Sequence, residues 1–296
     1  MGIKNSILYL IFFVSGFCGL CYEILWCREF NLILGHTTYA TAMVLASFMA
    51  GLAAGSWFFG RVADRVRSSM ALYAYLELAI GVYGIFFYRF IGIYKDFYIF
   101  AHPYMSSPAA EIAFKLFSSF ALIIVPTTLM GATFPVMAKI VLENIEKRGN
   151  SIGLIYFFNS AGGALGCFVC GFYMLYNFGS ELSLNIVTAL NILCGVSMLA
   201  VKSYCAPKLP AEGGAADLRP GKIAGVSAGG ERKYNQIFVY FMFSGFISML
   251  LEVCWTRFLI LIIGSSTYSF SLMLSVFIFF LAAGSLIAAY FADRIE

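Results

Sequence analysis

Charged residues are scarce in this sequence. Only 11% of its 296 residues are Asp, Glu, Lys or Arg, whereas 61% are hydrophobic. Soluble domains carry about 25% charged residues, so this composition excludes a soluble globular domain. Histidine is also rare: His36 and His102 each stand alone and do not indicate a metal site. The composition predicts an integral membrane protein.

Long apolar runs take the place of the missing charge. A helix needs about 20 apolar residues to cross the hydrocarbon core of a bilayer. The runs are continuous rather than alternating, which favours helices over strands. We therefore predict an all-α integral membrane protein with about eight transmembrane helices. They are expected at about residues 7–27, 38–60, 71–94, 112–134, 151–176, 181–201, 236–262 and 267–290.

The basic residues cluster in alternate connections between these runs. Cytoplasmic loops are enriched in Lys and Arg, so these connections are predicted to face the cytoplasm. Both termini then face the cytoplasm as well. The net charge of +4 fits loops that face anionic lipid, and it does not indicate nucleic-acid binding. The basic residues are Arg61, Arg65 and Arg67; Lys139, Lys147 and Arg148; and Lys202, Lys208, Arg219, Lys222, Arg232 and Lys233.

Residues 15–65 recur at 244–294 without a gap. The two copies share about 21 of 51 positions at a constant offset of about 229 residues. Six predicted crossings separate the copies, so they point in the same direction across the membrane. This arrangement resembles the parallel repeat of two six-helix halves in major facilitator transporters. The matched polar residues are Glu23 and Glu252, Trp26 and Trp255, Arg28 and Arg257, and Asp64-Arg65 and Asp293-Arg294.

The repeat and one break in composition divide the chain. Residues 203–233 are rich in Gly, Ala and Pro and lack a hydrophobic period, which indicates a flexible cytoplasmic linker. Residues 1–202 are then a six-helix membrane half. Residues 234–296 contain the first two helices of a second, incomplete half, and a missing C-terminal half is a candidate partner.

Three glutamates interrupt the apolar runs. Glu23, Glu77 and Glu252 lie inside predicted crossings, where a charge costs about 3 kcal/mol. One interpretation is structural: Glu23 pairs with Arg257 and Glu252 pairs with Arg28 across the two copies. The other interpretation is that the three carboxylates bind a ligand or carry protons. The sequence leaves both open.

Other residues in these helices receive structural interpretations. Trp26 and Trp255, which lie between each glutamate and arginine, are predicted to be structural. The pairs Cys18 and Cys21, and Cys167 and Cys170, are interpreted as small apolar residues between helices rather than as redox or metal-binding residues. We expect no metal and no cofactor.

The segment Gly60-Arg-Val-Ala-Asp64-Arg65 resembles the loop motif Gly-x-x-x-Asp-Arg of major facilitator transporters. Asp293 and Arg294 close its second copy. The resemblance implies a gating loop. The alternative is a polar turn whose arginines follow the charge rule for cytoplasmic loops.

A wider resemblance covers nearly the whole chain. SGFCGLCYEILWCREF and PTTLMGATFP resemble the membrane part of bacterial membrane-fused spermidine synthases, also called fused major facilitator and spermidine synthase proteins. The resemblance implies a following aminopropyltransferase domain, which transfers an aminopropyl group from decarboxylated S-adenosylmethionine to putrescine. We expect no such domain in these residues, because no Gly-rich nucleotide loop follows a strand. Whether the protein is an enzyme stays undecided.

These observations lead to three functional hypotheses. The favoured one is a membrane module that binds or moves a small cationic solute, such as a polyamine, for a spermidine synthase-like partner. The second is a membrane tether or scaffold for a separate aminopropyltransferase. The third is a major facilitator-like transporter of another solute.

The charge pattern makes a direct prediction of topology. Reporter domains fused after Arg67 and Lys147 should report the cytoplasm, and those fused after His36 and His102 should report the exterior. Paired reporters that are each active on one side of the membrane would measure this. An external signal from a fusion after Ser227 would contradict the parallel repeat.

Overall fold

The computed structural model describes residues 3–35, 38–66, 68–105, 107–142, 148–205, 228–264 and 266–292. All regular structure in these ranges is helical. A short 3₁₀ helix, η1 (His102–Tyr104), follows α3, and a π-helical turn, η2 (Cys170–Met174), joins α5 to α6. The α-helices are α1 (Ile3–Leu34), α2 (Thr38–Ala63), α3 (Ser69–Ala101), α4 (Pro108–Leu142), α5 (Arg148–Val169), α6 (Leu175–Cys205), α7 (Ala228–Ile263) and α8 (Ser266–Ala292).

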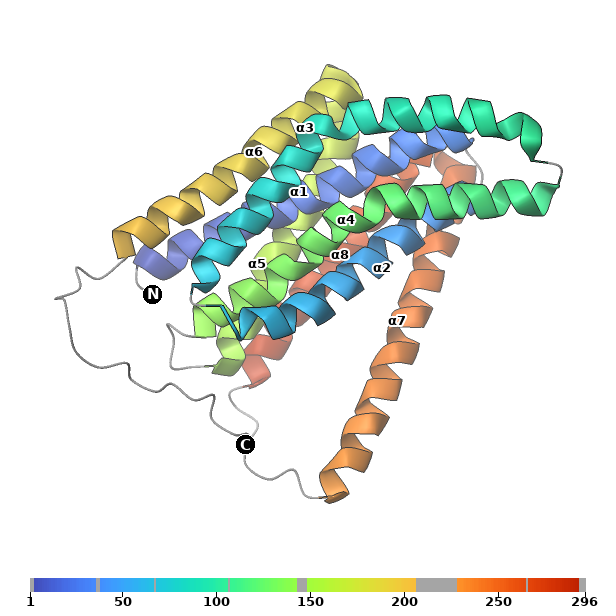
Figure 1. The fold of residues 1–296 in the computed structure, drawn as a ribbon. Coiled ribbons are helices and arrows are strands. Elements are labelled where there is room, and N and C mark those ends of the chain that lie inside the picture. The colour runs from blue at the N-terminus through green and yellow to red at the C-terminus, as the bar shows by residue number, and fades with distance from the viewer. Residues whose placement is uncertain are drawn as a thin grey trace.

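Seven helical runs among the described residues are long and apolar enough to cross a membrane. This finding is compatible with the predicted integral membrane protein. The fifth of these runs, Ile152–Tyr204, spans both the fifth and the sixth predicted crossing. Gly179 breaks that run with φ 70° and ψ −177°, a conformation that a residue without a side chain adopts easily. From this region α5 and α6 diverge as two rods (Figure 1).

Helix α1 occupies the centre of the bundle. It contacts α2, α3, α4, α5, α6 and α8, while α2 lies along α4, α3 lies along α6, and α8 lies along α5. Helix α7 leans away from the bundle and makes its main contact with α8 (Figure 1). The start of α1 and the ends of α2, α4, α6 and α8 lie at one end of the bundle (Figure 1). The basic residues at those helix ends, such as Arg61 and Lys139, therefore share one end.

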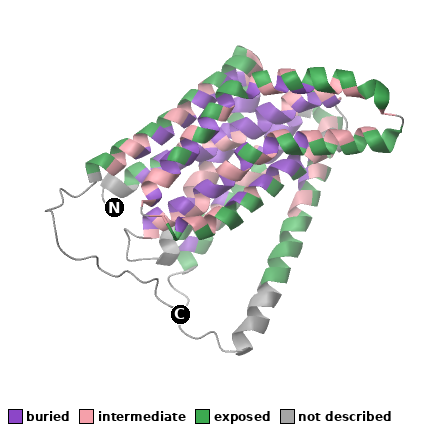
Figure 2. Ribbon diagram, viewed as in Figure 1, coloured by how far each residue is buried: buried purple, intermediate pink, exposed green. Residues whose placement is uncertain are grey.

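The core is aromatic and centred on Trp26. Its indole is 1% exposed and stacks on Phe87 with ring centroids 5.4 Å apart, and Tyr22, Phe48 and Tyr83 surround it. Large apolar side chains also cover the outside of the bundle, where Figure 2 shows mainly exposed residues. A soluble protein does not expose such a continuous apolar surface. The surface suits contact with lipid.

Several predicted boundaries are wrong because the helices extend further. Helix α6 continues to Cys205 and α7 begins at Ala228, so both ends of the predicted linker 203–233 are helical. The rest of that linker lies outside the described residues. The connection between the predicted crossings 71–94 and 112–134 is also shorter, because α3 runs to Ala101 and α4 starts at Pro108. Long helices satisfy their backbone groups internally, which lipid requires.

The predicted gating loop is described in its first copy only. Asp64 and Arg65 lie exposed in a turn after α2, and the Arg65 amide donates a hydrogen bond to the carbonyl of Val62 at 2.9 Å. Asp293 and Arg294 lie outside the described residues. The described copy is an exposed turn at the end of α2, and its role as a gate stays a prediction.

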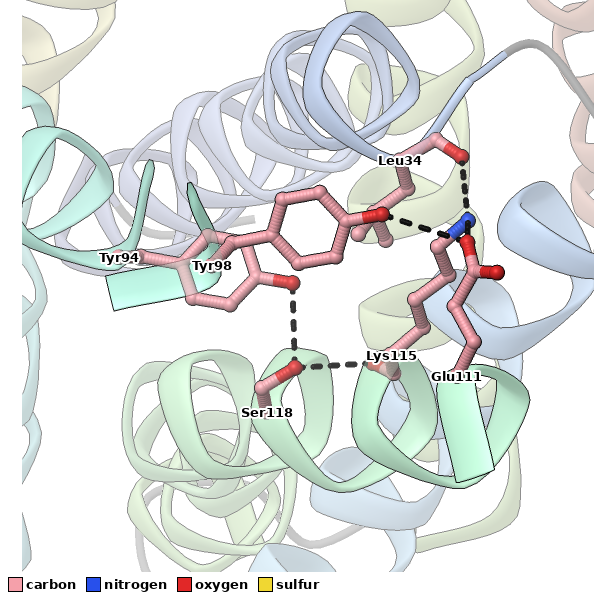
Figure 3. Close-up of polar contacts among 6 residues, drawn as sticks. All are labelled: Leu34, Tyr94, Tyr98, Glu111, Lys115 and Ser118. Atoms are coloured by element: carbon pink, nitrogen blue, oxygen red, sulfur yellow. Dashed lines mark hydrogen bonds and ion pairs between the residues drawn. The ribbon is translucent and has the colours of Figure 1, made fainter. Parts of the chain in front are cut away.

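A lysine on α4 fastens the end of α1 (Figure 3). Lys115 Nζ donates a hydrogen bond to the carbonyl of Leu34 at 3.1 Å and forms an ion pair with Glu111 at 2.7 Å. Glu111 in turn accepts a hydrogen bond from the Tyr98 hydroxyl at 3.3 Å. The last carbonyls of a helix lack partners within the helix and carry partial negative charge, so a cation stabilises them. This cluster joins α1, α3 and α4.

Replacement of this lysine should loosen the junction. Lys115→Met keeps the aliphatic stem and removes the charge, so the Leu34 carbonyl and Glu111 both lose a donor. We expect the free energy of unfolding to fall by about 1–2 kcal/mol, to be measured by denaturation in detergent. Lys95→Met is the matched control, because Lys95 is an exposed lysine on α3. An equal loss in both variants would contradict the role of Lys115.

Candidate functional site

A cavity of about 480 Å³ lies among the helices, and every one of the eight α-helices contributes to its wall. Small-molecule sites in proteins are concave, mostly apolar and about 300–1,000 Å³ in volume. This cavity fits that description, with apolar walls that include Leu20, Phe48, Met130, Leu274 and Phe277. It is therefore the candidate functional site.

All three glutamates predicted from the sequence line this one cavity. Glu23 on α1 and Glu77 on α3 are each 1% exposed, and Glu252 on α7 is 3% exposed. Among the described residues that line the cavity, none is Lys, Arg or His. The described wall of the cavity therefore contains three acidic side chains and no basic one.

The two repeat copies contribute the same positions to the wall. From α1 come Gly16, Gly19, Leu20 and Glu23, and from α7 come Gly245, Ser248, Met249 and Glu252. Each residue of the second set follows its counterpart by about 229 positions. Spacings of three and four residues place each set on one helix face. The internal repeat thus gives α1 and α7 matching faces, and both faces line the same cavity.

Glu77 is held by neighbouring side chains. The Ser15 hydroxyl donates a hydrogen bond to Glu77 Oε1 at 2.5 Å, and the Asn191 amide donates a hydrogen bond to Oε2. Both donors are buried, and they come from α1 and α6. Because both carboxyl oxygens have donors, Glu77 is fixed in place and ties three helices together.

Glu23 and Glu252 have a different environment. Both carboxyl oxygens of Glu23 and Oε1 of Glu252 are buried without a hydrogen-bond partner. The two residues line the same cavity. Buried polar groups in native proteins almost always have partners, so unpartnered carboxyl oxygens that face a cavity call for a proton or a bound cation.

The predicted ion pairs between the copies are wrong. Neither Glu23 nor Glu252 pairs with Arg28 or Arg257, and the ion pair found among the described side chains joins Lys115 to Glu111. Arg28 instead borders a separate small hollow together with Asn31 and Thr256. Within each copy the glutamate and the arginine are five positions apart, a spacing that turns the two side chains to different faces of the helix.

The tryptophans of the two copies also differ in setting. Trp26 is 1% exposed in the aromatic core, whereas Trp255 is 54% exposed. Helix α1 contacts six other helices, while α7 lies at the edge of the bundle. Equivalent sequence positions therefore experience unequal surroundings.

Sequence reasoning missed several polar residues of the cavity. Asn159 and Ser160 on α5, Asn191 on α6 and Ser15 on α1 line it, yet none was singled out. A signal was available, because asparagine inside an apolar crossing is costly and marks a buried polar contact. The predicted cysteine pairs lie elsewhere, between α1 and α5, where Cys170 Sγ approaches the Cys21 carbonyl at 3.9 Å.

The fold and the cavity together define a polytopic helical protein with an acidic internal site. Comparison with protein-family models, curated proteins and solved structures finds no match to this chain. The functional argument therefore rests on the geometry of the cavity.

The two types of glutamate should respond differently to substitution. Glu77→Leu leaves Ser15 and Asn191 without their acceptor, so we expect the free energy of unfolding to fall by about 1–3 kcal/mol. Glu23→Leu removes an unpartnered carboxyl from an apolar wall, so stability should stay equal or rise. Thermal unfolding in detergent measures both. A comparable loss in Glu23→Leu would show that Glu23 has a structural partner.

Proposed function

We propose that this protein binds a small cationic solute in the membrane cavity and moves it across the bilayer, and that a polyamine is the class of solute. The observation that carries the proposal is Glu23, whose two buried carboxyl oxygens face the cavity without a partner. A carboxylate in a wall without basic residues attracts an ammonium group more strongly than it would in water, because the surroundings have a low dielectric constant.

The distribution of polar groups favours a solute with more than one ammonium group. Glu23 and Glu252 form one acidic group, and Glu77 with its donors Ser15 and Asn191 forms another. Apolar side chains such as Leu20 and Phe48 line the same cavity. A polyamine matches this pattern, because its ammonium groups are separated by methylene chains. The resemblance to membrane-fused spermidine synthases supports the same class.

The repeat supports movement of the solute as well as binding. The solute site of repeat-built transporters lies between the repeated halves, near the middle of the membrane. Here the matched faces of α1 and α7 border one cavity. In this proposal the chain has a major facilitator-like repeat in a bacterial inner membrane, with both termini cytoplasmic. Asp64 and Arg65 then belong to a gating turn on the cytoplasmic side.

A pure tether is the less favoured alternative. A tether for a separate aminopropyltransferase needs apolar helices but has no use for a cavity with unpartnered carboxyl groups, which lower stability. A transporter of a different cation would use the same cavity. Binding measurements with a polyamine and with other cations separate these alternatives.

The proposal predicts specific effects on binding. Glu23→Gln and Glu252→Gln keep the side-chain shape and remove a charge, so each should weaken putrescine and spermidine binding by about tenfold or more. Isothermal titration calorimetry of the purified protein in detergent measures this. Folded yield should be unchanged, because the Glu23 oxygens have no partner to lose.

Two controls make the result decisive. Asp96→Asn removes an exposed carboxylate from α3 and should leave the affinity unchanged. 1,4-Butanediol has the carbon chain of putrescine without its charges and should not bind. Absence of amine binding to the unmodified protein would favour the tether. Binding of a monovalent cation but no polyamine would favour a transporter of another solute.

A further inference from the structure

One face of α8 is open in the second half of the helix. It consists of Phe280, Gly284, Ile287, Ala288 and Phe291, which share a helix face by their spacing and are all exposed. A Cβ atom added to Gly284 would meet no other atom within 4 Å. The opposite face of α8 is covered by α5, where Ser275 donates a hydrogen bond to the Ala164 carbonyl at 3.0 Å. We call the first face the open α8 face.

On α2, helix α4 covers the equivalent face at its glycines, Gly51 and Gly55. Gly55 is the counterpart of Gly284, and a Cβ atom on Gly55 would lie 2.0 Å from the Thr128 carbonyl oxygen. From the other side, a Cβ atom on Gly131 would lie 2.2 Å from the Leu52 carbonyl oxygen. The longest contact of α2 in the bundle is with α4. In the first repeat copy this glycine face is therefore a helix-packing surface.

We propose that the open α8 face docks a partner transmembrane helix with the chemistry of α4. Helices associate in lipid through close backbone approach at small residues, since apolar surface alone provides no driving force there. The sequence identity between the copies gives α8 the glycine that α2 uses for α4. The surface that α4 covers on α2 is open on α8. The helix that fits α8 should therefore resemble α4.

The two copies differ in where the closest approach falls. Gly51, which contacts Thr127 in the first copy, is replaced by Phe280 in the second. Ala288 is exposed one turn beyond Gly284, so the small pair in α8 is Gly284-x-x-x-Ala288. The partner helix should therefore lie closest to α8 at Gly284 and Ala288 and diverge toward Phe280.

A basic residue is the second expected feature of the partner. Lys115 of α4 donates a hydrogen bond to the carbonyl of Leu34, where α1 ends before Gly35. The counterpart of Leu34 is Ile263, where α7 ends before Gly264, and both glycines have positive φ, 86° and 77°. A Lys or Arg near the start of the partner helix would reach the Ile263 carbonyl in the same way.

A second copy of this chain does not supply such a helix. The glycine and threonine face of α4 is already covered by α2 of the same chain, at Thr128 and Gly131. The occupant is therefore a different helix, which this proposal defines by its small residues and its basic residue.

A synthetic α4 peptide provides the probe. A fluorescently labelled peptide of residues 108–142 is added to the full-length protein in detergent, with an acceptor dye on a cysteine introduced at Leu286. We expect saturable energy transfer. Gly284→Leu in the protein should weaken binding by about tenfold or more, because the added side chain blocks close approach. Gly131→Leu in the peptide should have the same effect.

The controls separate docking from folding. Gly284→Leu should melt at the temperature of the unmodified protein, because the position is open. Gly92→Leu adds the same side chain at another open glycine, on α3, and should leave peptide binding unchanged. Non-saturable transfer, or equal binding to Gly284→Leu, would overturn the proposal. A dimer of the chain that Gly284→Leu dissociates would assign the face to a second copy and would also overturn it.

Discussion

Close backbone contact between helices is the constraint on which the rest of this structure depends. A Cβ atom on Gly16 would lie 2.1 Å from the Asn159 carbonyl oxygen, and one on Gly162 would lie 2.0 Å from that of Phe13. Helices α1 and α5 can therefore touch along their backbones, as α2 and α4 do. In lipid this proximity replaces the hydrophobic effect as the source of helix association. It places α1 in the centre of the bundle and thereby places Glu23 inside the protein.

The cavity follows from the unequal environments of the two repeat copies. Helix α1 is central, with Trp26 in the aromatic core, whereas α7 lies at the edge, with Trp255 exposed. The space between their matching faces is not filled by side chains, since both faces carry small residues one or two turns before the glutamate, Gly19 in α1 and Gly245 in α7. The same small residues that permit helix contact elsewhere thus leave room for a solute here. The small residues of these helices therefore account both for the close helix packing and for the cavity.

The acidic residues show how one chemical group takes different roles in one cavity. Glu77 has a donor for each carboxyl oxygen and links α3 to α1 and α6. Glu23 has none, although it is equally buried. A buried charge without a partner is unfavourable, so proteins retain such groups where a ligand or a proton supplies the partner. This contrast makes Glu23, rather than Glu77, the residue that carries the functional proposal.

The sequence by itself determined the helical class and the equivalence of Glu23 with Glu252, because run length and repeated residues are local properties of the chain. It gave the helix boundaries only roughly: the predicted linker 203–233 is helical at both ends, where α6 runs to Cys205 and α7 begins at Ala228. The tertiary structure alone decided that three glutamates share a cavity, that Ser15 and Asn191 hold one of them, and that the arginines pair with neither of the others. Such pairings join residues more than 60 or 100 positions apart, such as Ser15 with Glu77 and Asn191 with Glu77. They depend on the rotation and approach of each helix, which no local pattern specifies.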